Sequence, residues 1–454
     1  MAKLLMAGAS AIDITPRESQ FLYGYPHVAR YSTGVHDPLL ASALTLSENR
    51  ESAQHTQLMF LVVDIIFVSK GLSHSVRRQI SERIGIPPEN IMISASHTHS
   101  GPITVDYISN ESDAVVPATD QAYLRYLEQR LIEAGVKAFE AARPARVGFA
   151  VADSTGIGTN RHDPSGPADH QVPVLVVKHA DTDQYIGCML VCSMHPTVLH
   201  EDSTLISADF PGMARQFLQA KLLATGCPVL HHTGPAGNQS PRHVTNGNTF
   251  AEAERLGHIL GRAVLGAISK AEYRSDISLY SHQLEIDLPR KTFPSVEAAR
   301  INLEKSRDRL KRLQSEHASR QEIRTAECDW FGAEETLTLA KAAAEGRLEA
   351  AYRSCRPAEI QIFGIGQWTF VGWQGEIFVE YALAVKHSSK NTFVISLANG
   401  ELQGYIVTPE AAAKDSYEAS NSLFSHESGK ILVDETLKAI HELSYRIGKK
   451  NHCR

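Results

Sequence analysis

The chain has 454 residues, of which 43% are hydrophobic and 21% charged, so it has enough apolar material for a large folded core. Its formal net charge of −6 and its isoelectric point near 6.4 argue against nucleic acid or an anionic membrane surface as the main partner. No apolar run approaches the roughly 18 residues that a transmembrane segment needs, and the N-terminus does not match a secretory signal.

Six cysteines are scattered along the chain without any Cys-x-x-Cys pair: Cys188, Cys192, Cys227, Cys328, Cys355 and Cys453. This pattern is typical of reduced thiols rather than of a disulfide framework. Together with the N-terminal segment, it predicts a cytoplasmic protein.

The first half of the chain alternates apolar strands with amphipathic helices. An apolar run at 58–66 precedes a helical pattern at 69–84 and a second run at 91–93. A helix at 122–142, strands at 173–178 and 185–192, and a helix that begins at Asp209 and ends near 223 are predicted next. This alternation predicts the α/β class: one large domain over 1–454, with mixed β-sheets flanked by helices.

The segment Ser94–Pro102 follows the second apolar run and contains two histidines, His97 and His99. A period of two sends both side chains to the same side, where the strand opens into a Gly-Pro loop. A single histidine at a strand end is usually a hydrogen-bonded structural residue, whereas a His-x-His pair can address one small volume, and imidazole is the commonest zinc ligand. The segment by itself leaves both interpretations open.

A glycine-rich loop at 233–241 follows a short strand at 228–232. It contains neither Gly-Lys-Ser/Thr nor Gly-x-Gly-x-x-Gly, which disfavours nucleotide binding. The segment 295–353 is rich in Ala, Glu and Arg, and Val296, Leu303 and Leu310 recur every seven residues. We expect a helical hairpin inserted between strands. Its charges are most simply a solvated face, with a dimer contact or a cover over the active site as alternatives.

Strands are predicted again at 360–371 and 392–397, and a last helix at 426–446. Polar residues collect at the ends of the predicted strands: His97, His99, Arg161, His195, Ser240, Glu376 and Tyr405. Each has a purely structural alternative. Glu376 could cap the following helix, Tyr405 could be a half-buried strand aromatic, and Ser240 could initiate a turn.

Five short motifs in one order resemble the catalytic domain of the neutral, non-lysosomal ceramidases. In this chain they are Ser96-His97-Thr98-His99-Ser100-Gly101-Pro102, His195-Pro196-Thr197, Gly237-Asn238-Gln239-Ser240-Pro241, Gln374-Gly375-Glu376 and Tyr405-Ile406-Val407-Thr408-Pro409-Glu410. The resemblance runs from about Ile12 to Lys438. It implies a zinc-dependent amidohydrolase that separates a fatty acid from a sphingoid amine.

Carried over to this sequence, the resemblance implies that zinc is held by His97, His195, Glu376 and Tyr405. It implies Ser240 as the catalytic serine, with His99 and Arg161 as further catalytic, substrate-contacting groups. A metal that polarises the amide carbonyl and lowers the pKa of a bound water suits amide hydrolysis. The sequence leaves open whether Ser240 or zinc-activated water attacks the carbonyl.

Three positions depart from the family motifs, at Asn238, Gln374 and Ile103-Thr104. The chain also ends soon after the last motif, whereas the ceramidases known for sphingolipid turnover carry a further β-sandwich domain. We therefore expect a short, cytoplasmic relative acting on a small N-acylated substrate, lipid or not. The alternatives are a hydrolase of another small amide or ester, and an inactive metal-binding or scaffold relative. The sequence leaves open whether the chain forms a homo-oligomer.

Overall fold

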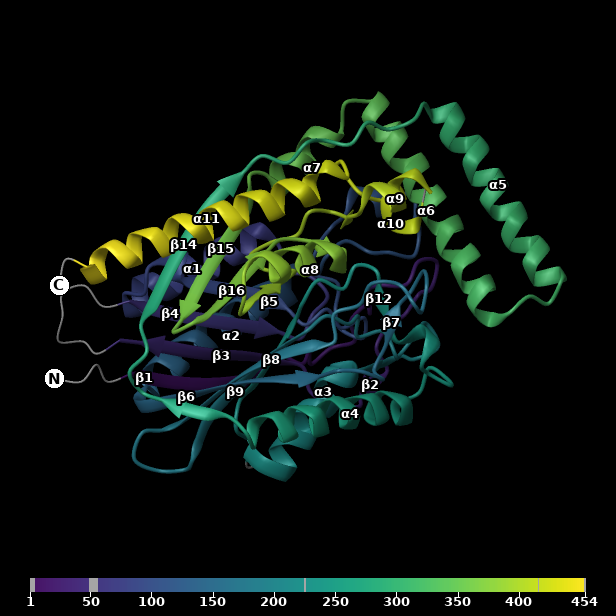
Figure 1. The fold of residues 1–454 in the computed structure, drawn as a ribbon. Helices are drawn as coiled ribbons and strands as arrows, with labels where there is room; N and C mark the ends of the chain where they lie inside the picture. Colours follow the sequence, from purple (N-terminus) through teal and green to yellow (C-terminus); the bar gives the residue numbers. More distant parts are fainter. Residues whose placement is uncertain (1–4, 49–55, 224–225, 415, 453–454) are drawn as a thin grey trace.

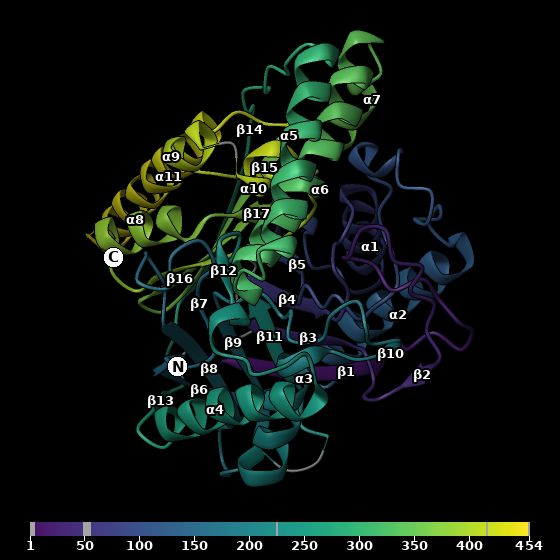
Figure 2. The same ribbon diagram turned by 90° about the vertical axis from the view of Figure 1, so that its right-hand side faces the viewer.

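The computed structural model describes residues 5–48, 56–223, 226–414 and 416–452. Two β-sheets pack face to face between layers of helices (Figures 1 and 2). The larger sheet has the order β11-β9-β8-β6-β1-β3-β4-β5, with β13 also paired to β6. Its strands are β1 (Met6–Asp13), β3 (Leu40–Ser47), β4 (Gln57–Val63), β5 (Ile91–Ala95), β6 (Arg143–Asp153), β8 (Gln171–His179), β9 (Tyr185–Cys192), β11 (Val229–Thr233) and β13 (Glu272–Arg274).

The smaller sheet has the order β14-β15-β16-β18 and mixes antiparallel with parallel pairing. Its strands are β14 (Leu279–Ile286), β15 (Ala358–Ile365), β16 (Trp368–Trp373) and β18 (Thr392–Ile395). Three two-residue pairs lie outside both sheets: β2 (Gly34–Val35) with β10 (Leu205–Ile206), β7 (Thr159–Asn160) with β12 (Gln239–Ser240), and β17 (Glu376–Ile377) with β19 (Tyr405–Ile406).

Strand β4 shows why the central strands are apolar throughout. Its odd-numbered residues from Met59 to Val63 pack toward helices, and its even-numbered residues from Leu58 to Val62 pack into the core between the two sheets. Phe60 meets Phe363 and Phe370 of the smaller sheet edge to face, with ring centroids 5.2 and 5.7 Å apart. A strand covered on both faces needs a continuous apolar run rather than an alternating one.

Helices cover the outer faces of both sheets (Figure 2). The side chains of α1 (Lys70–Ile84) and α2 (Gln121–Glu140) pack on β3, β4 and β5, whereas α3 (Asp209–Leu218) and α4 (Phe250–Ile268) pack on β8, β9 and β11. The smaller sheet is covered by α7 (Leu348–Cys355), α8 (Val379–Ser388) and α11 (Glu427–His452). Short helical turns fill the loops: η1 (Pro88–Asn90), η2 (Ile108–Asn110), η3 (Gln219–Leu223), η4 (Pro241–His243), α9 (Pro409–Ala413) and α10 (Tyr417–Ser420).

The segment expected to form a helical insertion contains α5 (Val296–Ser315) and α6 (Arg320–Ala344), followed by α7. The helices α5 and α6 lie side by side and project from the sheets (Figures 1 and 2). Helix α6 begins with a capping box, in which Ser319 and Glu322 exchange hydrogen bonds with each other's backbone N–H groups. The charged residues of α5 are exposed to solvent. One face of α6 is buried and turns toward the functional site described below.

The predicted α/β class with mixed sheets flanked by helices is confirmed. Helix α3 ends at Leu218, from which a π-helical turn continues to Leu223, and it begins at the predicted residue, Asp209. The Asp209 carboxylate accepts hydrogen bonds from the N–H groups of Val198 and Leu199, at 3.0 and 2.9 Å, and so anchors the loop after His195. Among the described cysteines none forms a disulfide, and Cys453 lies outside the described residues. Within the described ranges, no helix is long and apolar enough to span a membrane.

Candidate metal centre and active site

The larger sheet curls until its two outer strands, β5 and β11, approach each other. Ser94 of β5 lies 2.7 Å from His232 Nδ1 of β11, and Thr233 donates a hydrogen bond to Ser96 O at 2.8 Å. The end of β18 joins them, since Ser396 N donates to Thr233 O at 2.9 Å. The loops that follow strands distant in the sequence therefore open into one volume.

Three histidines meet in that volume: His97 and His99, which follow β5, and His195, which follows β9. Each offers a ring nitrogen within 4.8 Å of the other two. His97 has a φ of 70°, a left-handed conformation that is uncommon for a residue with a side chain. The loop thus turns sharply at the residue that places the first imidazole.

Backbone carbonyls select the same tautomer for all three rings. The Nδ1 atoms of His97, His99 and His195 lie 2.9, 3.2 and 2.6 Å from the carbonyl oxygens of Ile66, Gly24 and Ala236. A carbonyl oxygen only accepts hydrogen bonds, so each Nδ1 carries the proton and each Nε2 presents a lone pair. Histidines that bind metals typically donate a hydrogen bond from the other ring nitrogen in this way, which fixes the orientation of the ring.

Glu376, at the start of β17, brings a carboxylate to the same point. Its Oε2 lies 3.0 Å from His195 Nε2 and 3.2 Å from His97 Nε2, and His99 Nε2 lies 3.5 Å from His97 Nε2. Four acceptor atoms therefore converge with no donor between them. Zn–N bonds of 2.0–2.1 Å in a tetrahedron put neighbouring ligand atoms about 3.3 Å apart. The spacing and the imidazole–carboxylate donor set both fit a zinc ion.

The electrostatics of this cluster favour the protonation states that a metal needs. Burial lowers the pKa of His195, and burial together with the two neighbouring imidazoles lowers the pKa of His99 well below its usual value. Burial opposes the charge of Glu376, but the positive charge and hydrogen bonds that His97 and His195 supply when they are protonated outweigh it and hold its pKa well below the usual range. Neutral imidazoles and an ionised carboxylate are the forms that coordinate a cation.

Tyr405 lies beside Glu376 because their short strands, β17 and β19, pair in parallel with these two residues in register. Burial, followed by the charge of Glu376, raises the pKa of its phenol well above the usual value. A bound cation would act in the opposite direction. The structure thus brings together His97, His195, Glu376 and Tyr405, the four residues predicted as ligands, and adds His99 to the cluster.

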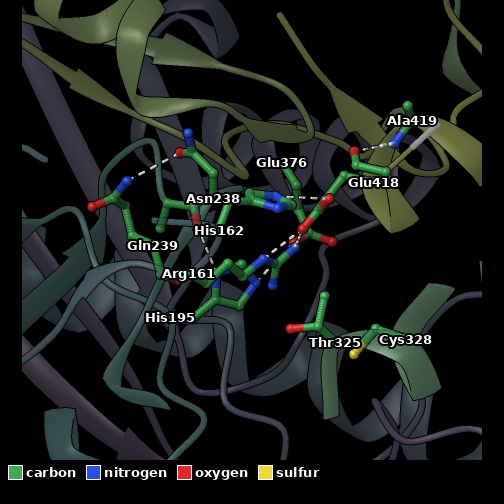
Figure 3. Close-up of polar contacts among 12 residues, drawn as sticks. Arg161, His162, His195, Asn238, Gln239, Thr325, Cys328, Glu376, Glu418 and Ala419 are labelled. Atoms are coloured by element: carbon green, nitrogen blue, oxygen red, sulfur yellow. Dashed lines mark hydrogen bonds and ion pairs between the residues drawn. The ribbon is translucent and has the colours of Figure 1, made fainter. Parts of the chain in front are cut away.

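Arg161 follows β7 and points toward Tyr405, with its guanidinium carbon 5.3 Å from the centre of the tyrosine ring. Its Nη2 forms an ion pair with Glu418 of α10 at 2.5 Å, and its Nε donates to the same carboxylate oxygen at 2.6 Å (Figure 3). Burial disfavours the charge of Arg161, but the attraction of Glu418 outweighs it and raises the pKa. His162 also contacts Glu418, at 3.0 Å. Arg161 is therefore held against a carboxylate before any substrate binds.

Ser240 sits at the end of β12 and caps η4, since its Oγ accepts a hydrogen bond from Arg242 N at 3.1 Å. Strand β12 pairs with β7, so Ser240 and Arg161 are placed by the same two-stranded unit. Together with His99, His195 and Tyr405, both residues line one cavity of about 80 Å³, which we call the arginine cavity. All seven predicted site residues therefore lie in or against one compact region.

A second cavity, of about 70 Å³, lies on the other side of His99 and Tyr405, and we call it the acidic cavity. Its lining includes Asp113, Glu335 and Glu376. Helix α6 of the insertion contributes to both cavities, through Glu335 on the acidic side and a group of residues on the other: Arg324, Cys328 and Phe331. The insertion therefore covers the site, one of the alternatives left open by its sequence.

Several residues of the site carry no signal in the sequence. Glu418 lies in a short helix outside every motif, and Tyr25 and Tyr417 line both cavities from segments with no distinctive pattern. Arg242 had a signal, because it follows Ser240 and Pro241 at the end of the glycine-rich loop. Glu335 could not have been found among the many acids of the insertion.

The departures from the family motifs are explained by local hydrogen bonds. The Asn238 amide donates to both oxygens of Glu380, at 3.0 and 2.8 Å, which an aspartate could not do. Gln374 accepts from Glu359 N at 3.1 Å, and Thr104 donates to Phe67 O at 2.7 Å. The departing residues themselves, Asn238, Gln374, Ile103 and Thr104, are not part of the lining described for either cavity.

Comparison with known proteins agrees with this arrangement. Residues 5–161 match the family model described as neutral/alkaline non-lysosomal ceramidase, N-terminal. The crystal structure of neutral ceramidase from Pseudomonas aeruginosa is similar with a TM-score of 0.73 and 17% identity, covering 96% of this chain and 74% of that chain. A structure of a ceramidase complexed with C2 is similar with a TM-score of 0.70 and 16% identity, covering 95% and 74%.

No protein of curated function matches the chain in sequence. At these identities the structural likeness establishes the fold, which the chain shares with the neutral ceramidases over nearly its whole length. The family model adds the N-terminal region, which contains His97, His99 and Arg161. The resemblance inferred from the five motifs is thereby confirmed, since residues 5–161 match the family model and the fold matches that of the neutral ceramidases.

Proposed function

We propose that this protein is a zinc-dependent amidohydrolase that cleaves an N-acyl bond. The observation that carries the proposal is the convergence of three imidazole Nε2 atoms and one carboxylate oxygen, with Ser240 and Arg161 lining the adjoining cavity. Without a cation, lone pairs at 3.0 to 3.5 Å would repel one another. The ceramidase relationship supports an amide as the bond that is cleaved.

His97, His195 and Glu376 would hold the zinc, with Tyr405 completing the shell and His99 beside it. When bound, zinc supplies a Lewis acid that polarises the substrate carbonyl and favours deprotonation of a nucleophile at neutral pH. These ligand side chains are buried, and charge interactions are stronger in the protein interior than in water.

The chain's own residues supply the remaining functions. Ser240 Oγ is placed to attack the carbonyl or to orient a water that does so. The Nε2 atom of His99 lies 3.5 Å from His97 Nε2 and borders the same cavity as Ser240, so it can accept a hydrogen bond from the nucleophile or the substrate. Arg161, fixed by Glu418, presents positive charge toward the cavity in which an oxyanion would develop.

Elemental analysis of the purified protein, combined with mass spectrometry of products, tests the proposal. We expect about one zinc per chain, and release of a free acid and an amine from at least one member of a panel of N-acyl amides that includes ceramides. Ser240→Ala should retain the zinc and lose most of the turnover. A protein with no zinc, or with zinc but hydrolysing only esters, would contradict it.

A further inference from the structure

The arginine cavity contains a cation without an acidic partner. Its lining includes Arg161, Arg242 and Arg324, and no Asp or Glu is among the described residues of that lining. Arg161 pairs with Glu418, and Arg324 pairs with Glu201 and Glu327. Only the third arginine, Arg242, lacks an ion pair with any carboxylate in the part of the chain that the structure describes.

Arg242 is held in place by neutral groups. One Nη atom donates to Thr325 Oγ1 at 3.4 Å and the other to Cys328 Sγ at 3.8 Å, both on α6, and these contacts are long. Burial, with Arg161 and Arg324 close by, lowers the pKa of Arg242, although arginine keeps its charge in proteins. A half-buried guanidinium with spare donors is costly unless an anion satisfies it.

Arg242 lines two neighbouring cavities. It lies two residues after Ser240, in η4, and lines the arginine cavity together with His195 and Tyr405. It also lines a larger cavity of about 440 Å³, with Arg320 and Arg324. The two acids of that lining, Glu201 and Glu327, both pair with Arg324 and therefore do not neutralise Arg242.

The other side of the cluster has the opposite character. The lining of the acidic cavity includes Asp113, Glu335 and Glu376, and no Lys or Arg appears among its described residues. Burial raises the pKa of Glu335 to about 8, and the Asn421 Oδ1 atom in the same wall is buried without a hydrogen-bond donor. Glu335 is therefore uncharged at neutral pH, and no cation described in this lining could pair with a carboxylate, so the two cavities differ in the charge that they accept.

We propose that Arg242 determines substrate specificity by binding a carboxylate of the substrate close to the scissile amide. The inference rests on the proposed amidohydrolase function and names its substrate class: a small N-acyl compound that carries a carboxylate, rather than an uncharged ceramide. A planar guanidinium matches a carboxylate in two parallel hydrogen bonds. A neutral lipid amide would leave this half-buried cation without a counter-ion.

Two substrate pairs distinguish which side of the amide bears the carboxylate. An N-acylglycine carries it on the amine side, and an N-alkylsuccinamic acid carries it on the acyl side. Each is compared with its carboxamide, which has almost the same shape but no charge. In the wild type we expect kcat/KM for at least one acid to exceed that of its carboxamide by about tenfold or more, the range of a charge-assisted hydrogen bond.

The variants Arg242→Gln and Arg242→Lys locate the effect. We expect the ratio of kcat/KM for the acid to kcat/KM for the carboxamide to approach one in Arg242→Gln. In Arg242→Lys it should stay intermediate, because lysine keeps the charge but cannot donate two parallel hydrogen bonds. Arg300→Gln, an exposed site on α5, removes the same charge away from the cavities and should leave the ratio unchanged. Thermal unfolding confirms that each variant is folded. An unchanged ratio in Arg242→Gln, or a wild type that prefers the carboxamides, overturns the inference.

A binding measurement tests the role of Arg242 independently of turnover. Calorimetry with the zinc-loaded protein, using N-acetylglycine and N-acetylglycinamide as probes, should show tighter binding of the acid, and Arg242→Gln should abolish the difference. Equal binding of the acid to wild type and Arg242→Gln overturns the inference. If no amide of the panel, ceramides included, is cleaved, the proposed function fails while the binding result still decides the role of Arg242.

Discussion

At the residue scale, the site depends on which nitrogen of each histidine carries the proton. Three backbone carbonyls, those of Gly24, Ile66 and Ala236, accept from Nδ1 and turn every Nε2 inward. The carboxylate of Glu376 then meets lone pairs rather than protons. A cation satisfies all of these atoms at once, which explains how so many acceptors coexist in a buried space.

His195→Ala and Glu376→Ala should abolish both zinc retention and turnover. Each removes one donor atom from the cluster and leaves the remaining ligands to hold the ion less tightly, by about 10-fold or more in affinity. Arg161→Ala is the matched control, because we expect turnover to fall while zinc stays bound. Zinc content by elemental analysis and initial rates measure both effects. Loss of zinc from Arg161→Ala would show that its assigned role is wrong.

Glu335 should make stability depend on pH. Its folded-state pKa of about 8 lies above the ordinary value of 4.5, because burial disfavours its charge. The folded state therefore binds this proton more tightly than the unfolded state, and the resulting stabilisation is lost as the pH rises from 4.5 toward 8. Relative to wild type, Glu335→Gln should gain melting temperature progressively across that window.

Thermal unfolding at pH 5, 7 and 9 measures this trend. Glu316→Gln, at the exposed end of α5, removes one negative charge from the same insertion and serves as the control. A constant difference between Glu335→Gln and wild type at all three pH values would contradict the prediction.

At the element scale, a buried ion pair fastens α1 to the smaller sheet. Arg77 of α1 donates two hydrogen bonds of 2.9 Å to Glu359 of β15, and the two side chains are 4% and 2% exposed. Gln283 and Asn399 donate to the same carboxylate, at 3.0 and 2.7 Å. A helix on the larger sheet, a strand of the smaller sheet and the loop after β18 are thus joined in one network.

Glu359→Gln should destabilise the protein strongly, by about 3–5 kcal/mol, because it leaves the Arg77 guanidinium buried without a counter-ion. The double variant Arg77→Met/Glu359→Leu removes both charges and should recover much of that loss. Denaturant unfolding followed by circular dichroism measures the differences. If the double variant is less stable than Glu359→Gln, the pair contributes more than the cost of an unpaired charge.

At the scale of the whole molecule, the candidate ligands of the proposed metal centre come from distant parts of the chain. His97 follows β5, His195 follows β9, and Glu376 follows β16 of the smaller sheet. The cluster therefore draws its residues from both sheets. An ion bound by all of them would bind only the folded state and stabilise the molecule as a unit.

Removal of zinc by a chelator should lower the melting temperature of the wild type, by an amount that grows with the zinc affinity. The same treatment should change His195→Ala little, because that variant already lacks the ion. Calorimetric scans with and without chelator, followed by zinc add-back, measure the effect. An equal shift in both proteins would show that the chelator acts elsewhere.

Sequence and structure contribute different parts of this picture. The strand β4 and the helix α2 were predictable. Burial on both faces leaves a continuous apolar run in the strand, and burial on one face leaves a helical period of apolar residues. The candidate ligands were predictable as residue types at strand ends and through their motif order. The partner of Arg161 was not, since Glu418 lies 257 residues away in a four-residue helix with no pattern.

The chain by itself determined the α/β class, the resemblance to the neutral ceramidases and the identity of the candidate ligands, because these follow from local periodicity and from short motifs. Only the tertiary structure decided that β5 and β11 meet, that α6 covers the site, and that the two cavities differ in charge. Those features depend on contacts between residues far apart in the chain, and a pairing of that kind has no period or spacing from which it can be predicted.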